Sequence, residues 1–280
     1  MLTAKRAGLS GTALKLVALL LMLMDHIQYF FQFTGAIPPW FSMLGRLSAP
    51  LFLFCTVEGF VHTHDRKRYF LRIYGIAAVM GFLVYLMAYR GIGVRPDGFY
   101  PLNGIFMDFV LLCILWQGID WLRARRWGRG LAAVLLPVIW PFLVAGFVGM
   151  VPAAAAVLVP LSFSVLPNWA FLTDGGWNYL LGGVLLYLFR ENRRVQVVVW
   201  MLWTFATDFL FVALSLAAAP GFHWSLMFTD YYEWYGILAG LLMLRYNGQR
   251  GAGLKRLFYL FYPAHVYLLY ALSWLVLAVR

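Results

Sequence analysis

Apolar residues fill most of this chain in long runs, which are separated by short segments rich in arginine, lysine and glycine. A helix needs about 20 such residues to cross the ~30 Å hydrocarbon core of a bilayer. The short alternating segments of a membrane β-barrel are missing, so the pattern predicts an all-α, polytopic membrane bundle forming one domain over residues 1–280. About nine spanning helices are expected, at residues 13–33, 40–61, 70–89, 101–122, 131–150, 177–189, 196–217, 234–245 and 257–279, with the runs at 177–189 and 234–245 short for full spans.

One apolar stretch does not fit a full span. Residues 153–166 are apolar but short, and Pro152 and Pro160 interrupt them. We expect a re-entrant or half-membrane segment here, in which protein or water satisfies any non-helical backbone. A tenth span is the alternative, and it would place the arginines within 190–194 on the outer side.

The distribution of basic residues favours nine spans. With that count, the clusters at 5–15, 66–72, 123–129, 190–194 and 245–256 all fall on one side of the membrane, as the positive-inside rule requires of the cytoplasmic side. We therefore expect a multi-pass protein of a bacterial cytoplasmic membrane with a cytoplasmic N-terminus. Of the 22 lysines and arginines, those outside this basic side are Arg46, Arg90, Arg95 and Arg280.

Composition narrows the class of protein further. Hydrophobic residues make up 63% of the chain and charged residues 12%, against roughly 45–50% and about 25% in soluble domains. A soluble enzyme, a disordered tail and a secreted disulfide scaffold are excluded. The net charge of +11 is interpreted as loop charge, and a nucleic-acid partner is not expected. Cys55 and Cys113 have no metal-ligand spacing, so no metal site is expected.

Ionisable residues inside spans are costly and therefore mark candidate functional sites. A helical rise of 1.5 Å per residue puts Asp25, His26, Arg46, Asp108 and Asp208 at one level in the outer half of the bilayer. A buried histidine can act as general base, with Asp25 and Arg46 holding it, so these three are the catalytic candidates. The residues expected to position an acceptor are Asn103, Asp108 and Asp208.

A second polar set lies toward the cytoplasmic side. Lys15 precedes His26 by about three helical turns, so both share one helix face about 16 Å apart. Basic side chains at this level suit a phosphorylated donor, because they bind phosphate through charge-assisted hydrogen bonds. The residues expected to bind this donor are Lys15, Glu58, His62, Arg66, Arg68, Arg72 and His265.

Three sequence stretches resemble the TraX family, whose namesake acetylates the N-terminus of pilin in conjugation. They are GLSGTALKLVALLLMLMDHIQYFF at 8–31, GRLSAPLFLFCTVEGFVHTHDRKRYFLRIY at 45–74 and LKRLFYLFYPAHVYLLY at 254–270. The middle of the chain is similar only in hydropathy. The resemblance implies an integral-membrane acetyltransferase.

A weaker similarity links the chain to the membrane acyltransferase-3 family. Lys15 and His26 resemble that family's Arg/Lys-x10-His element, and Arg68 to Arg72 resemble its arginine-rich entry to the third span. The resemblance implies acetyl-CoA as cytoplasmic donor and chemistry at His26. Lys15 stands where arginine is commoner, which removes bidentate phosphate contact.

We therefore expect an enzyme that moves acetyl from cytoplasmic acetyl-CoA to an amine or hydroxyl at the outer face, on a pilin N-terminus or an envelope glycan. The lipid bilayer and acetyl-CoA are the other expected partners. A proton-coupled secondary transporter is one alternative, since membrane carboxylates and histidines also form proton relays. A non-catalytic pilus or envelope assembly factor is the other.

Overall fold

The computed structural model describes residues 7–168 and 174–279, and within those ranges the regular structure is helical. Two compact units divide the chain, one drawn from residues 1–59 and 185–280 and the other from residues 60–184. Seven helical stretches are long and apolar enough to cross a membrane: 11–34, 40–62, 66–90, 105–123, 127–150, 193–216 and 257–279. The expectation of an all-α, polytopic membrane protein is confirmed.

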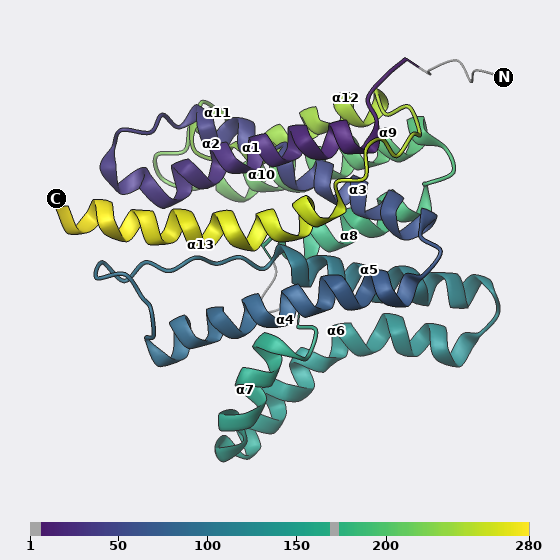
Figure 1. Cartoon of the computed structure of the whole chain (residues 1–280), viewed down its shortest axis with the longest axis horizontal. Helices are drawn as coiled ribbons and strands as arrows, with labels where there is room; N and C mark the ends of the chain where they lie inside the picture. Colours follow the sequence, from purple (N-terminus) through teal and green to yellow (C-terminus); the bar gives the residue numbers. More distant parts are fainter. Residues whose placement is uncertain (1–6, 169–173, 280) are drawn as a thin grey trace. The chain divides into compact units, whose positions relative to one another are not determined.

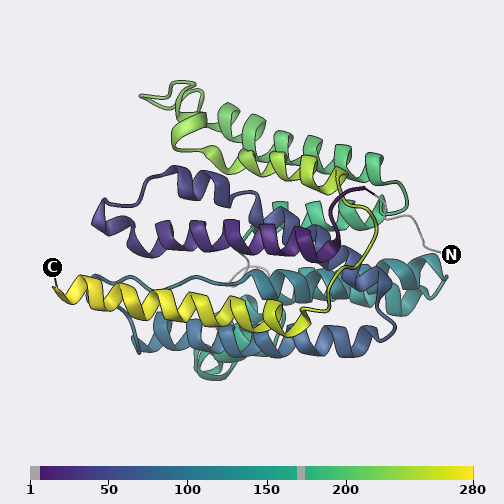
Figure 2. The ribbon, with the colours of Figure 1, turned by 45° about the horizontal axis from the view of Figure 1, so that its top comes forward.

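The first unit brings the two ends of the sequence together. Helices α1 and α13 contact each other and lie side by side (Figure 2), and the loop before α13 is bonded to the segment before α1. The first unit contains α1 (Gly11–Phe31), η1 (Gln32–Thr34), α2 (Trp40–Gly45), most of α3 (Ser48–His62), the end of α8 (Gly176–Leu188), α9 (Arg193–Thr204), the π-helical η3 (Phe205–Phe211), α10 (Val212–Leu216), α11 (Leu226–Thr229), η4 (Tyr232–Leu238), α12 (Ala239–Leu244) and α13 (Lys255–Val279).

Each of the nine predicted runs is helical, but two are shorter than a full span. Helix α8 has 13 residues, which correspond to about 20 Å at the helical rise per residue. The stretch Tyr232–Leu244 is similarly short. The stretch predicted to be re-entrant is also a short apolar helix, Pro152–Ser164.

The predicted span at 40–61 is broken between Gly45 and Ser48. Helix α2 ends at Gly45 and α3 begins at Ser48, with Arg46 and Leu47 between them. Pro50 explains the break, because a proline ring clashes with the carbonyl four residues earlier, here that of Arg46, and has no N–H to offer it. The chain therefore turns at Arg46 inside a run that hydropathy alone treats as continuous.

Helix α5 is the central helix of the second unit. It packs against both α4 and α6 (Figure 1), and 61% of its most apolar stretch is buried, against 17% for that of α6. The Nε1 of Trp116 donates to the carbonyl of Gly183 at 3.1 Å and ties α5 to α8. The second unit contains the end of α3, α4 (Arg66–Arg90), α5 (Ile105–Arg123), α6 (Trp127–Met150), η2 (Pro152–Ala154), α7 (Ala155–Ser164) and the start of α8.

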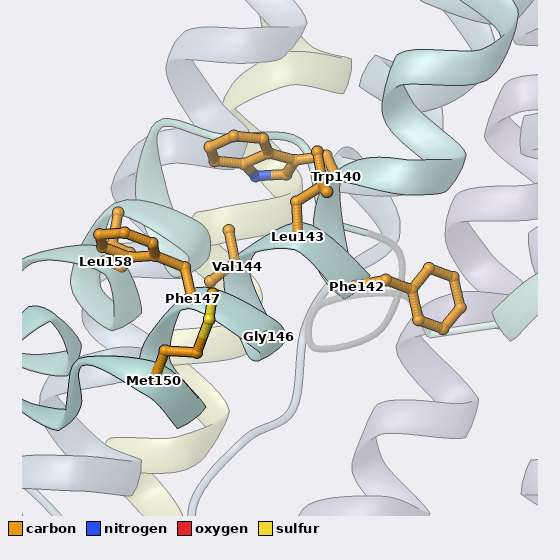
Figure 3. Close-up of a pocket in the computed structure, with 8 residues that line it drawn as sticks. All are labelled: Trp140, Phe142, Leu143, Val144, Gly146, Phe147, Met150 and Leu158. Carbon is orange, nitrogen blue, oxygen red and sulfur yellow. The ribbon is translucent and has the colours of Figure 1, made fainter.

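An apolar groove of about 480 Å³ lies against α6 and α7 in the second unit (Figure 3). Its lining consists of Trp140, Phe142, Leu143, Val144, Gly146, Phe147, Met150 and Leu158. These side chains are mostly apolar and carry no ionisable group, so the groove offers no chemistry of its own. Such a surface is suited to contact with lipid chains.

A glycine lets α1 and α2 approach closely. A Cβ placed on Gly45 would overlap the Cβ and carboxylate of Asp25 on α1. The neighbouring polar contacts between the two helices depend on this approach.

We expect Gly45→Ala to destabilise the protein by about 1–3 kcal/mol, because the added methyl overpacks the α1–α2 contact. Gly75→Ala is the matched control, since a Cβ on Gly75 in α4 meets nothing within 4 Å. The control is expected to be neutral or stabilising by up to ~1 kcal/mol through helix propensity. Thermal unfolding in one detergent compares the two; equal shifts would contradict the close approach.

Candidate functional site

A network of charged side chains joins three elements of the first unit. Arg46 Nη2 donates to Asp25 Oδ1 on α1 at 2.6 Å and to Ser42 Oγ on α2 at 2.8 Å. Ser42 Oγ in turn donates to the same Asp25 oxygen at 2.5 Å. Arg46 Nη1 donates to both carboxylate oxygens of Glu233 on η4, at 3.0 and 3.1 Å. One guanidinium therefore connects α1, α2 and η4.

Arg46 has no donor left for a substrate. Its Nε donates to the Ser42 carbonyl at 3.2 Å, so with the bonds above all five guanidinium N–H groups are used. The side chains of Arg46 and Asp25 are 26% and 20% exposed, whereas that of Glu233 is 63% exposed. The Asp25 pair is therefore the stronger part of the network, since exposed ion pairs contribute little.

His26 pairs with a second histidine rather than with its sequence neighbour Asp25. His26 Nδ1 on α1 lies 2.6 Å from His265 Nε2 on α13. His265 Nδ1 lies 2.7 Å from the carbonyl oxygen of Phe261, one turn earlier on α13. Asp25 and His26 thus face different neighbours, as adjacent residues about 100° apart on a helix must.

The geometry of the two rings is that of an in-plane hydrogen bond. Their planes differ by 13° while their centroids are 4.8 Å apart, a much larger separation than the 2.6 Å between the bonded nitrogens. Two nearly parallel rings have both this short nitrogen–nitrogen distance and this long centroid separation when they lie edge to edge. Tyr29, Phe30 and Tyr262 surround His26 with ring centroids 6.1–6.4 Å away.

The opposite end of α1 carries an unpaired cation. Lys15 Nζ lies 5.5 Å from the ring centroid of Phe258 on α13. No carboxylate in the described part of the chain forms an ion pair with it. Lys15 and His26 therefore lie on the α13-facing side of α1, as the sequence spacing predicted.

Loop 245–254 fixes the beginning of α1. Leu9 N donates to the Arg245 carbonyl and Gly11 N to the Gln249 carbonyl, both at 2.8 Å. The Thr12 hydroxyl bonds to the carbonyls of Arg250 and Ala252. Helices α1 and α13 consequently begin at the same end of the first unit, which we call the basic end and define by Lys15, Arg190, Arg193, Arg194, Arg245 and Arg250.

Glu58 is part of an ion pair at the basic end. Arg193 Nη2 lies 3.0 Å from Glu58 Oε1, and Arg193 Nη1 donates to Gln196 at 2.6 Å. Tyr246 also bonds to Glu58, and burial raises the pKa of this phenol to about 12, so it stays protonated at neutral pH. Glu58 is therefore engaged by protein groups, and its predicted role toward the donor stays a prediction.

Four other predicted donor residues belong to the second unit: His62, Arg66, Arg68 and Arg72. Arg66 pairs with Asp120 at 2.7 Å and stacks 4.5 Å from the centroid of Phe60. Arg68 is exposed and lies 3.4 Å from Asp65, which also caps α4. Arg72 and His62 are exposed. Any role of these four side chains in donor binding stays a prediction.

Asp108 lies in a polar cluster of the second unit, and Asn103 is a buried residue two positions before α5. Asp108 is fully buried and accepts a hydrogen bond from the Asp174 backbone N–H at 3.1 Å. The Asp174 carboxylate accepts from the backbone N–H groups of Gly104 and Ile105, at 2.6 and 2.9 Å. Asp174 thus caps α5, and the cluster has an evident structural role.

Asp208 lies in the π-helical segment of the first unit. It accepts a hydrogen bond from Thr207 at 2.8 Å. The adjacent Phe209 packs 5.2 Å from the ring centroid of Trp234, which follows Glu233 on η4. Such π-helical turns occur frequently at functional sites, and this one places Asp208 beside the element that carries Glu233.

Several partners of the predicted residues were not predicted from the sequence. Ser42 is one helical turn before Arg46 and could have been found from that spacing. Arg193 was read only as loop charge. Glu233 and Asp174 gave no sequence signal for their contacts, since both lie far along the chain from Arg46 and Asp108.

These features define a multi-pass helical membrane protein with a charged network and a histidine pair between its helices. The chain matches the family described as "TraX protein" over residues 10–273, and it belongs to that family. The resemblance drawn from its motifs is confirmed.

Two relatives show how far the similarity extends. The chain is 25% identical over 274 residues to the probable fimbrial assembly protein FimC, serogroup H1, of Dichelobacter nodosus, covering 95% of this chain and 96% of that protein. It is 30% identical over 128 residues to protein TraX of Escherichia coli, covering 45% and 46% of the two chains. No solved structure matches.

We expect Arg46→Lys to destabilise the protein by about 1.5–3 kcal/mol, because an ammonium cannot replace the fork of donors that holds Asp25 and Ser42. Arg90→Lys is the control, since Arg90 is exposed at the end of α4, and it should cost no more than about 0.5 kcal/mol. Chemical unfolding measures both. A larger cost for Glu233→Gln than for Asp25→Asn would contradict the ranking of the two ion pairs.

Proposed function

We propose that this protein is an integral-membrane acetyltransferase. It takes acetyl from acetyl-CoA at the basic end of the first unit and transfers it to an acceptor near His26. The observation that carries the proposal is a partly buried histidine whose Nε2 makes no hydrogen bond with the described residues, on the same helix face as an unpaired lysine.

The basic end suits the phosphates of the donor. Lys15 has no competing carboxylate among the described residues, so its charge is available to an anion. Helices α1 and α13 both begin here, and the N-terminal end of each carries a partial positive charge from the helix dipole. These charges together favour a phosphorylated ligand over a neutral one.

The distance between Lys15 and His26 suits the length of the donor. Eleven residues of helix correspond to about 16 Å, which is about the length of the pantetheine arm between the phosphates and the thioester. An extended donor along the α1–α13 contact would bring its acetyl group to His26 while its phosphates stay at Lys15.

His26 supplies the proton chemistry of the transfer. Its Nε2 removes a proton from the acceptor as the acceptor nitrogen or oxygen attacks the thioester carbonyl. The tetrahedral intermediate then collapses, the carbon–sulfur bond breaks, and the proton passes from His26 to the departing thiolate. Arg46 would have to break an existing bond to stabilise the oxyanion, so we assign it to holding α1 in place.

The acceptor side of the first unit is acidic, which favours an amine over a hydroxyl. Glu233 and Asp230 are exposed there, and Asp208 lies on the element beside η4. An amine arrives largely as an ammonium ion, which these carboxylates attract. A carboxylate or water takes the first proton from the ammonium, and His26 takes the second as the neutral amine attacks. The name of the fimbrial relative is consistent with a pilin N-terminus as acceptor, and an envelope glycan is the other acceptor class.

The orientation follows from the same charge asymmetry. We propose that the basic end faces the cytoplasm of a bacterial cell, because basic loops are retained on that side of the cytoplasmic membrane. Acetyl-CoA is then available to Lys15, and the acceptor approaches from the opposite side.

Two other functions have support from single observations. The break at Arg46 and the π-helical turn at Asp208 interrupt spanning helices, as happens in secondary transporters. The fimbrial relative's name also fits a non-catalytic assembly factor. A proton-driven flux without acetyl-CoA binding would favour the transporter. Wild-type function after simultaneous His26 and Arg46 substitution would favour the assembly factor.

We expect His26→Ala to lower acetyl transfer about 10²–10⁴-fold, the usual contribution of a general base. The measurement is transfer from labelled acetyl-CoA, by protein in lipid nanodiscs, to a peptide with a free N-terminus and to glycans. The same peptide with a blocked N-terminus tests the preference for an amine. His223→Ala is the control, because His223 is an exposed histidine of the same unit. Unchanged turnover in His26→Ala would overturn the assignment.

We expect Lys15→Ala to weaken acetyl-CoA binding about 10–100-fold, the loss of one or two charge-assisted contacts to phosphate. Lys15→Arg should retain binding because it keeps the charge. Arg129→Ala removes an exposed cation of the second unit as a control for net charge. Ligand-induced thermal stabilisation reports each affinity. An equal loss in the Lys15 and Arg129 variants would contradict a specific site.

A further inference from the structure

We propose that His265 is a positioning residue that fixes the proton on Nδ1 of His26 and so leaves Nε2 of His26 free to act as the base. This inference rests on the proposed acetyl transfer for its kinetic consequences. The two hydrogen bonds that carry it, from His26 to His265 and from His265 to Phe261, exist independently of that function.

The positions of the protons follow from the carbonyl oxygen of Phe261, the acceptor at the end of the two hydrogen bonds. A carbonyl oxygen can only accept, so His265 Nδ1, 2.7 Å from the Phe261 oxygen, must carry a hydrogen. A neutral imidazole has a single N–H, so His265 Nε2 is then an acceptor. His26 Nδ1, 2.6 Å away, must donate to it. The remaining nitrogen of His26, Nε2, therefore holds a lone pair.

The opposite placement of the proton between the two histidines would leave His26 Nε2 protonated and unable to act as a base. If His265 carried a second proton, its Nε2–H would donate to His26 Nδ1, and the neutral His26 would hold its hydrogen on Nε2. His265 is 5% exposed, and no carboxylate forms an ion pair with it in the described chain. A buried charge without a partner is costly, so the neutral form of His265 and the competent form of His26 are favoured together.

A histidine in this position differs from the carboxylate of a serine-protease triad. A carboxylate both orients the base and neutralises the imidazolium, whereas the chain from His26 ends on a neutral carbonyl. Asp25, the nearest carboxylate in sequence, is bonded instead to Ser42 and Arg46. The imidazolium of His26 is therefore stabilised less, which suits rapid return of the proton to the departing thiolate.

The test compares two substitutions that differ in hydrogen bonding. His265→Leu removes the acceptor, and we expect kcat to fall by about 10²-fold or more, as for a base held in the wrong tautomer, while KM for acetyl-CoA changes less than about twofold. His265→Gln can offer its amide oxygen to His26 Nδ1, so kcat should stay within about tenfold of wild type. Equal losses in both variants, or none in His265→Leu, would overturn the proposal.

A control for the loss of packing uses Val266, the next residue of α13. Val266 is 1% exposed and makes no hydrogen bond to His26, so Val266→Ala removes buried volume from the same turn. We expect this variant to lower thermal stability while keeping kcat within about twofold, since only the packing contact is lost. A loss of kcat in Val266→Ala equal to that in His265→Leu would show that His265 acts only through packing.

A spectroscopic readout separates this inference from the proposed function. NMR of ring nitrogens in histidine-labelled wild-type protein should show His26 protonated at Nδ1 and bare at Nε2, with the resonance assigned by His26→Gln. In His265→Leu the signal should become a mixture of both tautomers. Dominant Nε2–H in wild type would overturn the proposal even if transfer occurs. The expected tautomer without any acetyl transfer would instead refute the proposed function alone.

Discussion

A guanidinium at membrane depth must have its charge and its donors satisfied, and this requirement organises the first unit. Arg46 satisfies it with Asp25 from α1, Ser42 from α2 and Glu233 from η4. The break in the helix that places Arg46 there comes from Pro50, and the close approach comes from Gly45. This one side chain joins two neighbouring elements, α1 and α2, to η4, which lies far along the sequence.

Helix α1 carries two adjacent residues that contact two different partners. Asp25 faces Arg46, and His26 faces His265 on α13. Fixing Asp25 also fixes the rotation of α1, so the ring of His26 has a defined direction. The charged network therefore supports the candidate base indirectly, by holding the helix that carries it.

The first unit is chemically different at its two ends. Cations gather where α1 and α13 begin, and carboxylates gather around η4 and the π-helical turn. A transfer from an anionic donor to a cationic acceptor would use both ends. His26 lies between Lys15 and the end of α1, so one helix would contact donor and acceptor together.

Hydropathy was sufficient to predict the helices, because the membrane imposes a minimum length on every span. The common depth of Asp25 and Arg46 was also predictable, since depth can be counted along a helix. The partner of His26 was not, because a contact between α1 and α13 depends on how the helices associate. Hydropathy also merged α2 with α3 and counted two short helices as full spans. Hydropathy alone does not show that Pro50 interrupts the run at 40–61.

The central claim is transfer of acetyl between two sides of a membrane through the first unit. Its most direct measurement uses sealed vesicles with the protein inserted in one orientation, acetyl-CoA enclosed on one side and an amine-bearing peptide on the other. We expect acetylated peptide only when acetyl-CoA is on the side of the basic end, with the peptide on the opposite side. Transfer that requires donor and acceptor on the same side, or no transfer in either arrangement, would contradict it.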